Sequence, residues 1–374
     1  MRILGGTDAS GLGISIGIEN GLQGAANADT PYLDATGLTV VPGFIDIQIN
    51  GAFGWDFTEE PESIWEVGTR LPETGVTAFC PTIITSSQEN IVAAQAAIGR
   101  RPPGYSGAEP IGLHIEGPYL SPDKRGTHPV ELLRLPGDIT LAGDGIAIVT
   151  CAPELPGALE LIDELASRGI VVSIGHSSAT GDQSRAALDA GATLGTHLFN
   201  AMPPITARDP GLAGVLLADP RAFFGVIADG HHLDPATLRL AWNAAPDRFC
   251  IITDAIAATG QPDGRYRIGS VDVEMRDGVV RNADGVLAGA AVTMDRELAI
   301  LMSVTGAPLS EAVAAVTFNP SEAVGAWDRG RLRRGTRGDL TLLERGEVAA
   351  TIVGGTVVFL CDEDRWKTSK RAPA

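Results

Sequence analysis

The sequence predicts an α/β fold, a (β/α)8 TIM-like barrel with a small β domain made from both chain ends. Two observations carry this prediction: short apolar runs alternate with helix-like segments, and strand-like segments occupy both ends of the chain. Several runs are continuously apolar, as parallel strands buried on both faces should be. The eight runs span residues 38–49, 75–84, 111–115, 146–152, 170–174, 192–198, 223–228 and 249–253.

Segments with helical periodicity lie between these runs, at residues 91–98, 159–166, 184–190 and 236–244. An open doubly wound sheet is the alternative, and it would usually carry a glycine-rich phosphate loop after its first strand. The first run instead ends in Gln48-Ile49-Asn50-Gly51, which has no such loop. The barrel is therefore the favoured fold.

The chain ends show a different pattern. Residues 14–18 alternate with period two, as expected of a strand with one buried face. After the eighth run, residues 266–287 indicate short strands, residues 295–326 indicate helices, and residues 339–343 and 349–359 indicate strands again. We predict a small β domain of residues 1–40 and 335–374, beside a barrel of residues 41–334.

Composition narrows the function. The 374 residues include 28 Lys and Arg against 46 Asp and Glu, a net charge of −18 that disfavours nucleic-acid binding. No apolar run approaches the ~18 residues of a membrane-spanning helix, and we see no secretory signal. The four cysteines are far apart and match no metal or redox spacing, so we expect reduced thiols in a cytoplasmic protein.

All six histidines fall on a predicted barrel strand or in the loop after one. Active sites of such barrels lie at the carboxyl ends of the strands. His176 and His197 follow two consecutive runs, and Glu116 ends an earlier run, so the three side chains should meet at one mouth. Two imidazoles and one carboxylate with an open position are typical of a catalytic zinc or iron site.

Two aspartates lie on the strands themselves. Asp254 ends the eighth run, where it would be either a proton acceptor beside a metal-activated water or a helix N-cap, and position alone does not decide. Asp46 is a charge inside the apolar first run, so it must be paired or hydrogen-bonded. We interpret Asp46 as a structural or supporting group.

Several motifs then carry a resemblance. Segment 42–46, Pro-Gly-Phe-Ile-Asp, resembles the first barrel strand of the amidohydrolase superfamily. Other segments resemble N-acetylglucosamine-6-phosphate deacetylases, in order from about residue 40 to residue 343. They include Leu-His-Ile-Glu-Gly-Pro-Tyr-Leu at 113–120, Lys-Arg-Gly-Thr-His at 124–128, Thr-His-Leu-Phe-Asn-Ala-Met-Pro at 196–203, Ala-Asp-Gly-His-His at 228–232 and Thr-Asp-Ala at 253–255.

The resemblance implies a distorted barrel with a β-sandwich built from both termini. It also implies a hydrolase of a linear amide C–N bond, which converts N-acetyl-D-glucosamine 6-phosphate to D-glucosamine 6-phosphate and acetate. By the same resemblance, Glu116, His176 and His197 bind one divalent metal per subunit, Zn²⁺ or Fe²⁺. Asp254 is the general base and then the acid, and His128 polarises the amide carbonyl.

The resemblance further implies a set of substrate-binding residues. Within it, Arg208 and His232 hold the phosphate, and Arg208 reaches the site of a neighbouring subunit, which implies a homodimer. Three consecutive residues line the acetyl pocket. The full set is Thr127, His128, Asn200, Ala201, Arg208, His232, Leu287, Ala288 and Gly289.

One departure from the superfamily matters. Many amidohydrolases carry His-x-His at the end of the first strand and bind a second metal there, whereas this chain has Gln48 and Asn50. Neutral amides are weak zinc ligands compared with imidazole, so we predict a single metal. His231 is given no catalytic role.

Three alternatives stay open. The first is a deacetylase of N-acetylgalactosamine 6-phosphate, which differs from the glucosamine compound only at C4. The second is a catalytically silent scaffold, whose signature would be loss of Asp254 or a ligand. The third is a hydantoinase or dihydroorotase type, disfavoured because those enzymes usually keep His-x-His and a bridging lysine.

Overall fold

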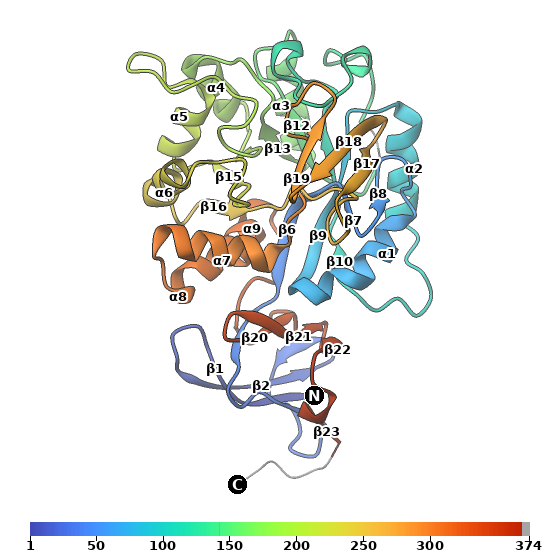
Figure 1. Cartoon of the computed structure of the whole chain (residues 1–374), viewed down its shortest axis with the longest axis vertical. Helices are drawn as coiled ribbons and strands as arrows, with labels where there is room; N and C mark the ends of the chain where they lie inside the picture. Colours follow the sequence, from blue (N-terminus) through green and yellow to red (C-terminus); the bar gives the residue numbers. More distant parts are fainter. Residues whose placement is uncertain (142, 369–374) are drawn as a thin grey trace.

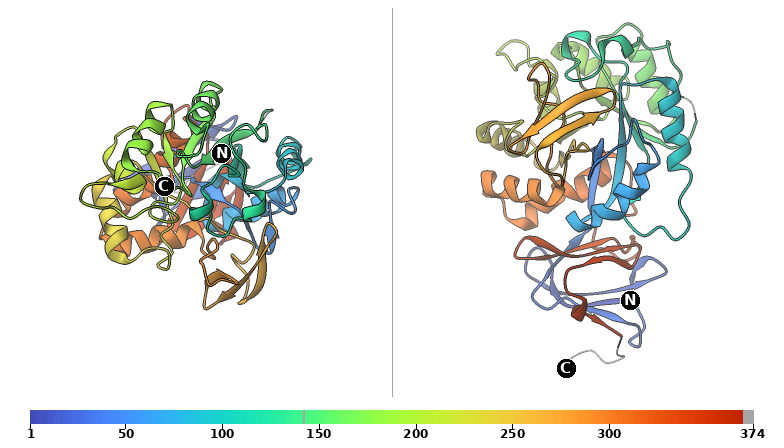
Figure 2. Two further views of the ribbon diagram at one scale, coloured as in Figure 1. Left: turned by 90° about the horizontal axis from the view of Figure 1, so that it is seen from above. Right: turned by 45° about the vertical axis from the view of Figure 1, so that its right-hand side comes forward.

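A computed structural model describes residues 1–141 and 143–368 of the chain. Figure 1 shows a large barrel with helices around it and a smaller β domain beneath, where the N-terminus lies. The right-hand view of Figure 2 shows the same two bodies joined end to end. Among the described residues, no helix is both long and apolar enough to cross a membrane.

The barrel is formed by parallel strands, and within the described residues each of the eight predicted runs supplies one of them. Neighbours in the sheet follow the chain order, with β6 beside β9 at one end and β16 at the other. The predicted barrel is confirmed. Its strands are β6 (Phe44–Ile49), β9 (Val76–Ile84), β11 (Leu113–Glu116), β12 (Ile146–Cys151), β13 (Val171–Ile174), β14 (Leu194–Gly195), β15 (Phe223–Val226) and β16 (Phe249–Ile251).

The barrel closes where the end of β16 meets β6. The backbone N–H of Asp254 donates to the carbonyl of Gln48 at 2.9 Å. Beneath it, the Thr253 hydroxyl donates to Oδ2 of the fully buried Asp46 at 2.5 Å. Asp46 is thus hydrogen-bonded as its buried position requires. Burial raises the pKa of Asp46 to about 7, so this carboxyl group at the seam changes its charge near neutral pH.

Helices cover the outside of the barrel, and the four predicted ones are present. Local capping explains where two of them begin: Thr180 and Gln183 form a capping box, and Asp234 accepts from the backbone N–H of Ala236. Two further helices, α1 and α5, were not predicted. The helices are α1 (Ser63–Arg70), α2 (Gln88–Ile98), α3 (Ala158–Ser167), α4 (Gly181–Asp189), α5 (Gly211–Ala218) and α6 (Pro235–Ala244).

The regular alternation is interrupted in two places. After β11 the chain forms two 3-10 turns, η2 (Pro122–Lys124) and η3 (Val130–Leu132). After β16 it forms an antiparallel sheet beside the barrel mouth, which precedes the last helices. These elements are β17 (Gly264–Ile268), β18 (Val271–Arg276), β19 (Val279–Asn282), α7 (Met294–Thr305), α8 (Leu309–Ala312), η4 (Val313–Val316) and α9 (Phe318–Ala323).

Shorter elements complete the barrel region. The hairpin of β7 and β8 follows β6, and β10 pairs in parallel with Ala78 and Phe79 of β9. They are β7 (Gly51–Ala52), β8 (Trp55–Asp56), η1 (Leu71–Thr74) and β10 (Glu109–Pro110).

Strands from both termini form the small β domain, as predicted. β5 pairs antiparallel with β20, although most of the barrel separates them in sequence, and β5 runs on into β6. The domain has an apolar core of its own, with Ile3, Leu33 and Leu340 fully buried. Its elements are β1 (Arg2–Thr7), β2 (Gly13–Glu19), β3 (Leu22–Gly24), β4 (Tyr32–Asp34), β5 (Thr39–Pro42), β20 (Leu340–Glu344), β21 (Glu347–Val353), β22 (Thr356–Leu360), η5 (Glu363–Arg365) and β23 (Trp366–Lys367).

The domain boundaries at residues 40 and 335 stay a prediction, and residues 369–374 of the predicted domain lie outside the described residues.

Candidate active site

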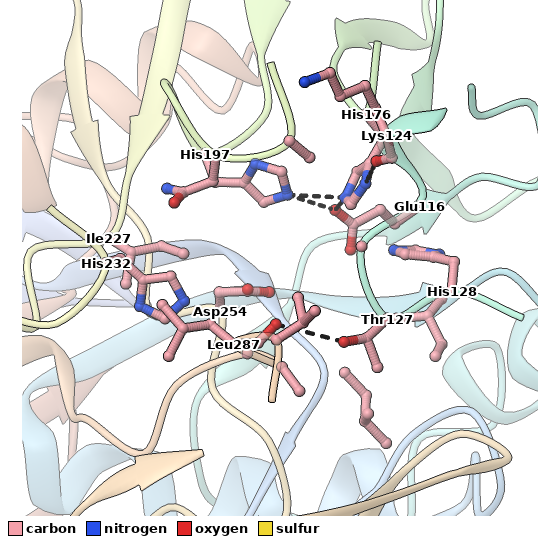
Figure 3. Close-up of a pocket in the computed structure, with 18 of the residues that line it drawn as sticks. Glu116, Lys124, Thr127, His128, His176, His197, Ile227, His232, Asp254 and Leu287 are labelled. Carbon is pink, nitrogen blue, oxygen red and sulfur yellow. Dashed lines mark hydrogen bonds and ion pairs between the residues drawn. The ribbon is translucent and has the colours of Figure 1, made fainter. Parts of the chain in front are cut away.

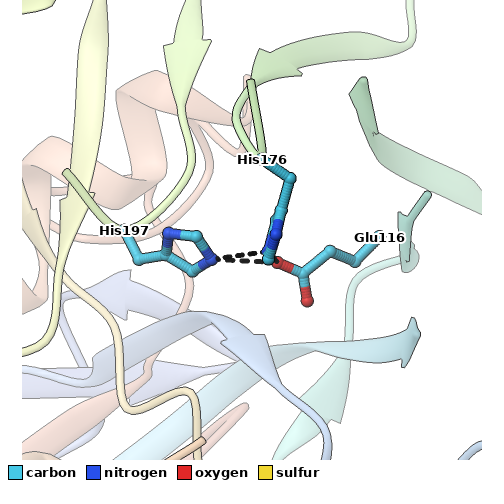
Figure 4. A group of neighbouring side chains, drawn as sticks. All are labelled: Glu116, His176 and His197. Atoms are coloured by element: carbon cyan, nitrogen blue, oxygen red, sulfur yellow. Dashed lines mark hydrogen bonds and ion pairs between the residues drawn. The ribbon is translucent and has the colours of Figure 1, made fainter. Parts of the chain in front are cut away.

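Glu116, His176 and His197 converge at the carboxyl end of the barrel (Figure 4). The two imidazole Nε2 atoms are 2.9 Å apart, and they lie 3.2 Å and 3.3 Å from Oε1 of Glu116. All three residues are buried, with at most 5% of their surface exposed. The three donor atoms therefore face one common point, as the sequence predicted.

This donor set fits a metal ion. Ligand atoms at ~2.0–2.1 Å from a tetrahedral ion lie roughly 3.3 Å from one another, close to the spacing seen here. Burial would raise the pKa of Glu116, but hydrogen bonds from His176 and His197 outweigh it and hold that pKa well below the usual value. Glu116 is therefore an anion, as a metal ligand must be. His176 also holds its Nδ1 against the carbonyl of Lys124 at 2.9 Å, which fixes the ring.

The backbone at these strand ends is unusual. His176, His197 and Asp254 have φ angles of 47°, 30° and 47°, in the left-handed region that non-glycine residues rarely adopt. Each of the three follows a barrel strand directly or within a few residues. The left-handed residue turns the chain sharply and leaves its side chain at the barrel mouth. Such backbone strain tends to occur at functional sites, where the surrounding structure enforces it.

Asp254 lies beside the cluster with one oxygen already engaged. Its Oδ1 accepts from Asn50 Nδ2 at 2.8 Å and from Gln48 Nε2 at 3.3 Å. Gln48 Nε2 also donates to Oε1 of Glu116 at 3.0 Å, so the Gln48 amide links the two carboxylates. Burial and then the charge of Glu116 raise the pKa of Asp254 to about 6. A carboxylate with this pKa can both accept and return a proton near neutral pH.

Thr85 meets Nδ1 of His128 with two groups. Its backbone N–H donates to Nδ1 at 3.3 Å, and its hydroxyl lies 2.8 Å from the same nitrogen. We assign Nδ1 as the acceptor of both contacts. Burial, with a smaller effect of His176, lowers the pKa of His128 to about 3, which keeps the ring neutral. A neutral imidazole with an accepting Nδ1 carries its hydrogen on Nε2. His128 is thus able to donate one hydrogen bond into the pocket.

A cavity of about 360 Å³ opens beside the cluster (Figure 3). Every predicted site residue except Arg208 lines it, so the structure brings together segments from six parts of the chain. Those lining residues are Glu116, Thr127, His128, His176, His197, Asn200, Ala201, His232, Asp254, Leu287, Ala288 and Gly289.

Residues 287–289 form one wall of the cavity, beside the end of the eighth strand. Gly289 has φ 65°, and a Cβ there would lie 2.8 Å from the carbonyl oxygen of Asp254, so glycine is needed for this close approach. Thr127 Oγ1 donates to the carbonyl of Leu287 at 3.4 Å and joins this wall to the loop after β11. The small residues Ala288 and Gly289 leave a narrow apolar space.

Two cations near the mouth differ from the sequence-based picture. Arg208 is exposed and does not line the cavity in the described part of this chain. Lys124, which was given no role, does line it, and its Nζ contacts the carbonyl of Met202 at 3.3 Å. The sequence did contain a signal for a site role of Lys124, because this residue begins the motif that ends in His128. His231 is exposed, in keeping with its lack of an assigned role.

Comparisons with known proteins agree with this geometry. Residues 39–358 match the Amidohydrolase family, a metal-dependent family. The N-acetylglucosamine-6-phosphate deacetylase of Rattus norvegicus is 38% identical over 88% of this chain and 86% of its own length. The N-acetylgalactosamine-6-phosphate deacetylase of Escherichia coli O157:H7 is 36% identical over 82% of this chain and 83% of its own.

Solved structures show the same relationship. N-acetylglucosamine-6-phosphate deacetylase from Pasteurella multocida superposes with a TM-score of 0.87 at 30% identity, covering 98% of this chain and 99% of that one. A mutant of the Mycobacterium smegmatis enzyme, in complex with N-acetyl-D-glucosamine-6-phosphate, superposes with a TM-score of 0.81 at 34% identity, covering 92% and 94%. The chain therefore belongs to the amidohydrolase family and, within it, to the N-acetylglucosamine-6-phosphate deacetylases.

Proposed function

We propose that this protein hydrolyses the acetamide of N-acetyl-D-glucosamine 6-phosphate to D-glucosamine 6-phosphate and acetate. The observation that carries the proposal is the convergence of Glu116, His176 and His197 beside Asp254 in one buried cavity. That arrangement offers a metal site and a proton acceptor side by side. Membership of a deacetylase family supplies the substrate class.

Glu116, His176 and His197 are the proposed ligands of one divalent ion, Zn²⁺ or Fe²⁺. Such an ion supplies Lewis acidity, which lowers the pKa of water from ~16 toward ~7 and stabilises negative charge on a carbonyl oxygen. Gln48 and Asn50 donate hydrogen bonds to the carboxylates, and neither amide is a strong ligand. These contacts support the prediction of a single ion.

The proton transfers fall to Asp254. Its Oδ1 is held by Asn50, so Oδ2 is the proposed acceptor of the proton that the attacking water loses. As the water oxygen bonds to the amide carbon, Nε2–H of His128 donates to the carbonyl oxygen. Asp254 then returns the proton to the amide nitrogen as the C–N bond breaks. The products are acetate and the amino sugar.

Substrate binding follows from the rest of the cavity. The phosphate is proposed to bind His232, Lys124 and Arg208, with Arg208 contributed by the second copy of a homodimer. Arginine suits phosphate because its planar fork makes two parallel hydrogen bonds. The acetyl group faces the wall of residues 287–289. The proposed contacts of the sugar are Thr127, Asn200 and Ala201.

The cytoplasmic location expected from the sequence stays a prediction.

N-acetylgalactosamine 6-phosphate is the second candidate substrate, because one of the relatives acts on that sugar by its name. The two compounds differ only at C4. Acetate release from each, measured side by side at equal enzyme concentration, separates them by kcat/KM.

The primary test is acetate release from N-acetylglucosamine 6-phosphate, with metal-loaded protein and a chelated control. We expect release that depends on the metal. The absence of release from folded, metal-loaded protein with either sugar would overturn the proposed function.

A further inference from the structure

The loop after β15 is held by a buried carboxylate of its own. Oδ1 of Asp229 accepts from the backbone N–H groups of His231 and His232, at 2.8 Å and 2.9 Å. Oδ2 of Asp229 lies 2.8 Å from Nδ1 of His232. Both side chains are 6% exposed. Asp229 therefore fixes the loop backbone and the imidazole ring at the same time.

This pairing decides which atom of His232 faces the cavity. Burial opposes the ionised form of Asp229, but the hydrogen bond and charge of His232 hold the pKa of that carboxyl below its usual value. Asp229 is thus an acceptor, and Nδ1 of His232 carries a hydrogen. Nε2 is the atom left for the cavity, into whose lining His232 projects (Figure 3).

A second carboxyl supports the same loop from outside the barrel. Glu297, on the first turn of α7, is fully buried, and its Oε1 accepts from the backbone N–H of Ala228 at 3.1 Å. Its Oε2 meets no hydrogen-bonding partner among the described residues. Burial, and next the charge of Asp229, raise the pKa of Glu297 well above its usual value. The buried surroundings therefore favour the neutral form of Glu297, which accepts from the loop without adding a buried negative charge.

We propose that Asp229 and Glu297 are positioning residues for phosphate recognition, which hold the loop of residues 228–232 so that the His232 ring, with a hydrogen on both nitrogens when the substrate is bound, donates from Nε2 to a phosphate oxygen. The inference rests on the proposed function, because it needs a phosphorylated substrate. It extends the phosphate site to two side chains that touch neither substrate nor metal. Asp229 acts through the ring of His232, and Glu297 acts through the backbone that carries Asp229.

Asp229→Asn is the sharper variant. The amide keeps an oxygen for the two backbone N–H groups, but its nitrogen cannot accept from Nδ1–H of His232, and it carries no negative charge to balance a ring with a hydrogen on both nitrogens. We expect KM for the phosphorylated sugar to rise about tenfold or more, the size of one lost hydrogen bond to a charged group. We expect kcat to stay within about threefold, and the ratio of kcat/KM for phosphorylated over unphosphorylated N-acetylglucosamine to fall.

Glu297 is tested by a pair of variants. Glu297→Gln keeps a neutral acceptor of the same shape and should leave KM near the wild-type value. Glu297→Leu fills the space but leaves the N–H of Ala228 unpaired, and should raise KM as Asp229→Asn does. Asp295→Asn, on the same helical turn, is the matched control and should change neither constant. Equal KM values in both Glu297 variants would overturn the role of Glu297.

A second measurement does not depend on substrate turnover, so it also tests variants whose activity is too low to measure. Nitrogen-15 NMR of the histidine rings should report a protonated Nδ1 for His232 in the wild type and a changed Nδ1 signal in Asp229→Asn. An unchanged signal would overturn the role of Asp229. A wild-type enzyme without preference for the phosphorylated sugar would overturn the proposed function and this inference with it. A preference that Asp229→Asn leaves intact would overturn the inference alone.

Discussion

On one side of the cavity, Glu116, His176 and His197 are at most 5% exposed and lie within hydrogen-bonding distance of one another. The two cations of the proposed phosphate site are held more loosely: Lys124 lines the cavity half-buried, and Arg208 is exposed outside it. The first group sits on strands β11, β13 and β14 or just after them, whereas the second belongs to the longer loops that follow strands. The ligand side is preformed by the barrel itself.

The difference teaches where each kind of function is built. Chemistry needs atoms held to within a fraction of an ångström, and the strand ends supply that accuracy. Binding of a flexible phosphate tolerates longer side chains on loops. Variants of the ligand side should therefore lower kcat, and variants of the phosphate side should raise KM.

Loss of the metal should have the largest effect. Glu116→Ala removes the one anionic ligand, and we expect kcat to fall about a thousandfold or more because the ion supplies several kcal/mol of transition-state stabilisation. The measurement is acetate release together with metal content by elemental analysis. Glu131→Gln, an exposed carboxylate after β11, serves as the control. Wild-type turnover in Glu116→Ala would show that the cluster is not the catalytic centre.

Asp254→Asn should come next. The amide cannot accept the proton of the attacking water, so kcat should fall about 10²- to 10⁴-fold. Bound metal and KM should change little, because Asp254 lies beside the three ligands and is not one of them. If this variant turned over substrate at the wild-type rate, the base would have to be another group.

Arg208→Ala tests the phosphate side. KM for the phosphorylated sugar should rise about tenfold or more, and KM for the unphosphorylated sugar should not change. Arg100→Ala, another exposed arginine, is the control. Mixing Arg208→Ala with Asp254→Asn subunits should restore activity, because mixed dimers then contain one site with both residues intact. Absence of complementation after verified subunit exchange would place Arg208 outside the neighbouring site.

The last prediction concerns stability and not catalysis, at the seam where β16 meets β6. The pKa of Asp46 is about 7 in the folded protein against 3.8 for an ordinary aspartate, so the folded state keeps the proton longer. The stability that Asp46 contributes is therefore lost as pH rises from about 4 to 7, at no more than about 1.4 kcal/mol per pH unit. As the pH rises over this range, the melting temperature of Asp46→Asn should increase relative to that of the wild type. If the melting temperatures of Asp46→Asn and the wild type changed with pH in parallel, this prediction would be refuted. The control is Asp272→Asn at an exposed site, for which we expect such parallel behaviour.

Much of the fold and the site was predictable because parallel barrel strands leave a strong pattern. Their apolar runs and polar ends located Glu116, His176, His197 and Asp254 without any structure. Helix α5 escaped prediction because its sequence, Gly-Leu-Ala-Gly-Val-Leu-Leu-Ala, is apolar on nearly every face and has no helical period.

Other site features were beyond the reach of the sequence. Nothing in the local sequence distinguishes Glu297 from a surface glutamate. Only the packing of α7 against the barrel brings it to Ala228. Lys124 reaches the cavity through the course of an irregular loop, which no periodicity describes. The destination of Arg208 depends on a second chain, which a single sequence does not specify.

The pairing of β5 with β20 also has a consequence for biosynthesis. About 300 residues separate the two strands, and a ribosome adds roughly 5–20 residues each second, so β20 emerges some tens of seconds after β5. During that interval the N-terminal strands present an unpaired edge, and such edges invite association with other chains. Early shielding of the nascent N-terminal segment should therefore raise the yield of this protein.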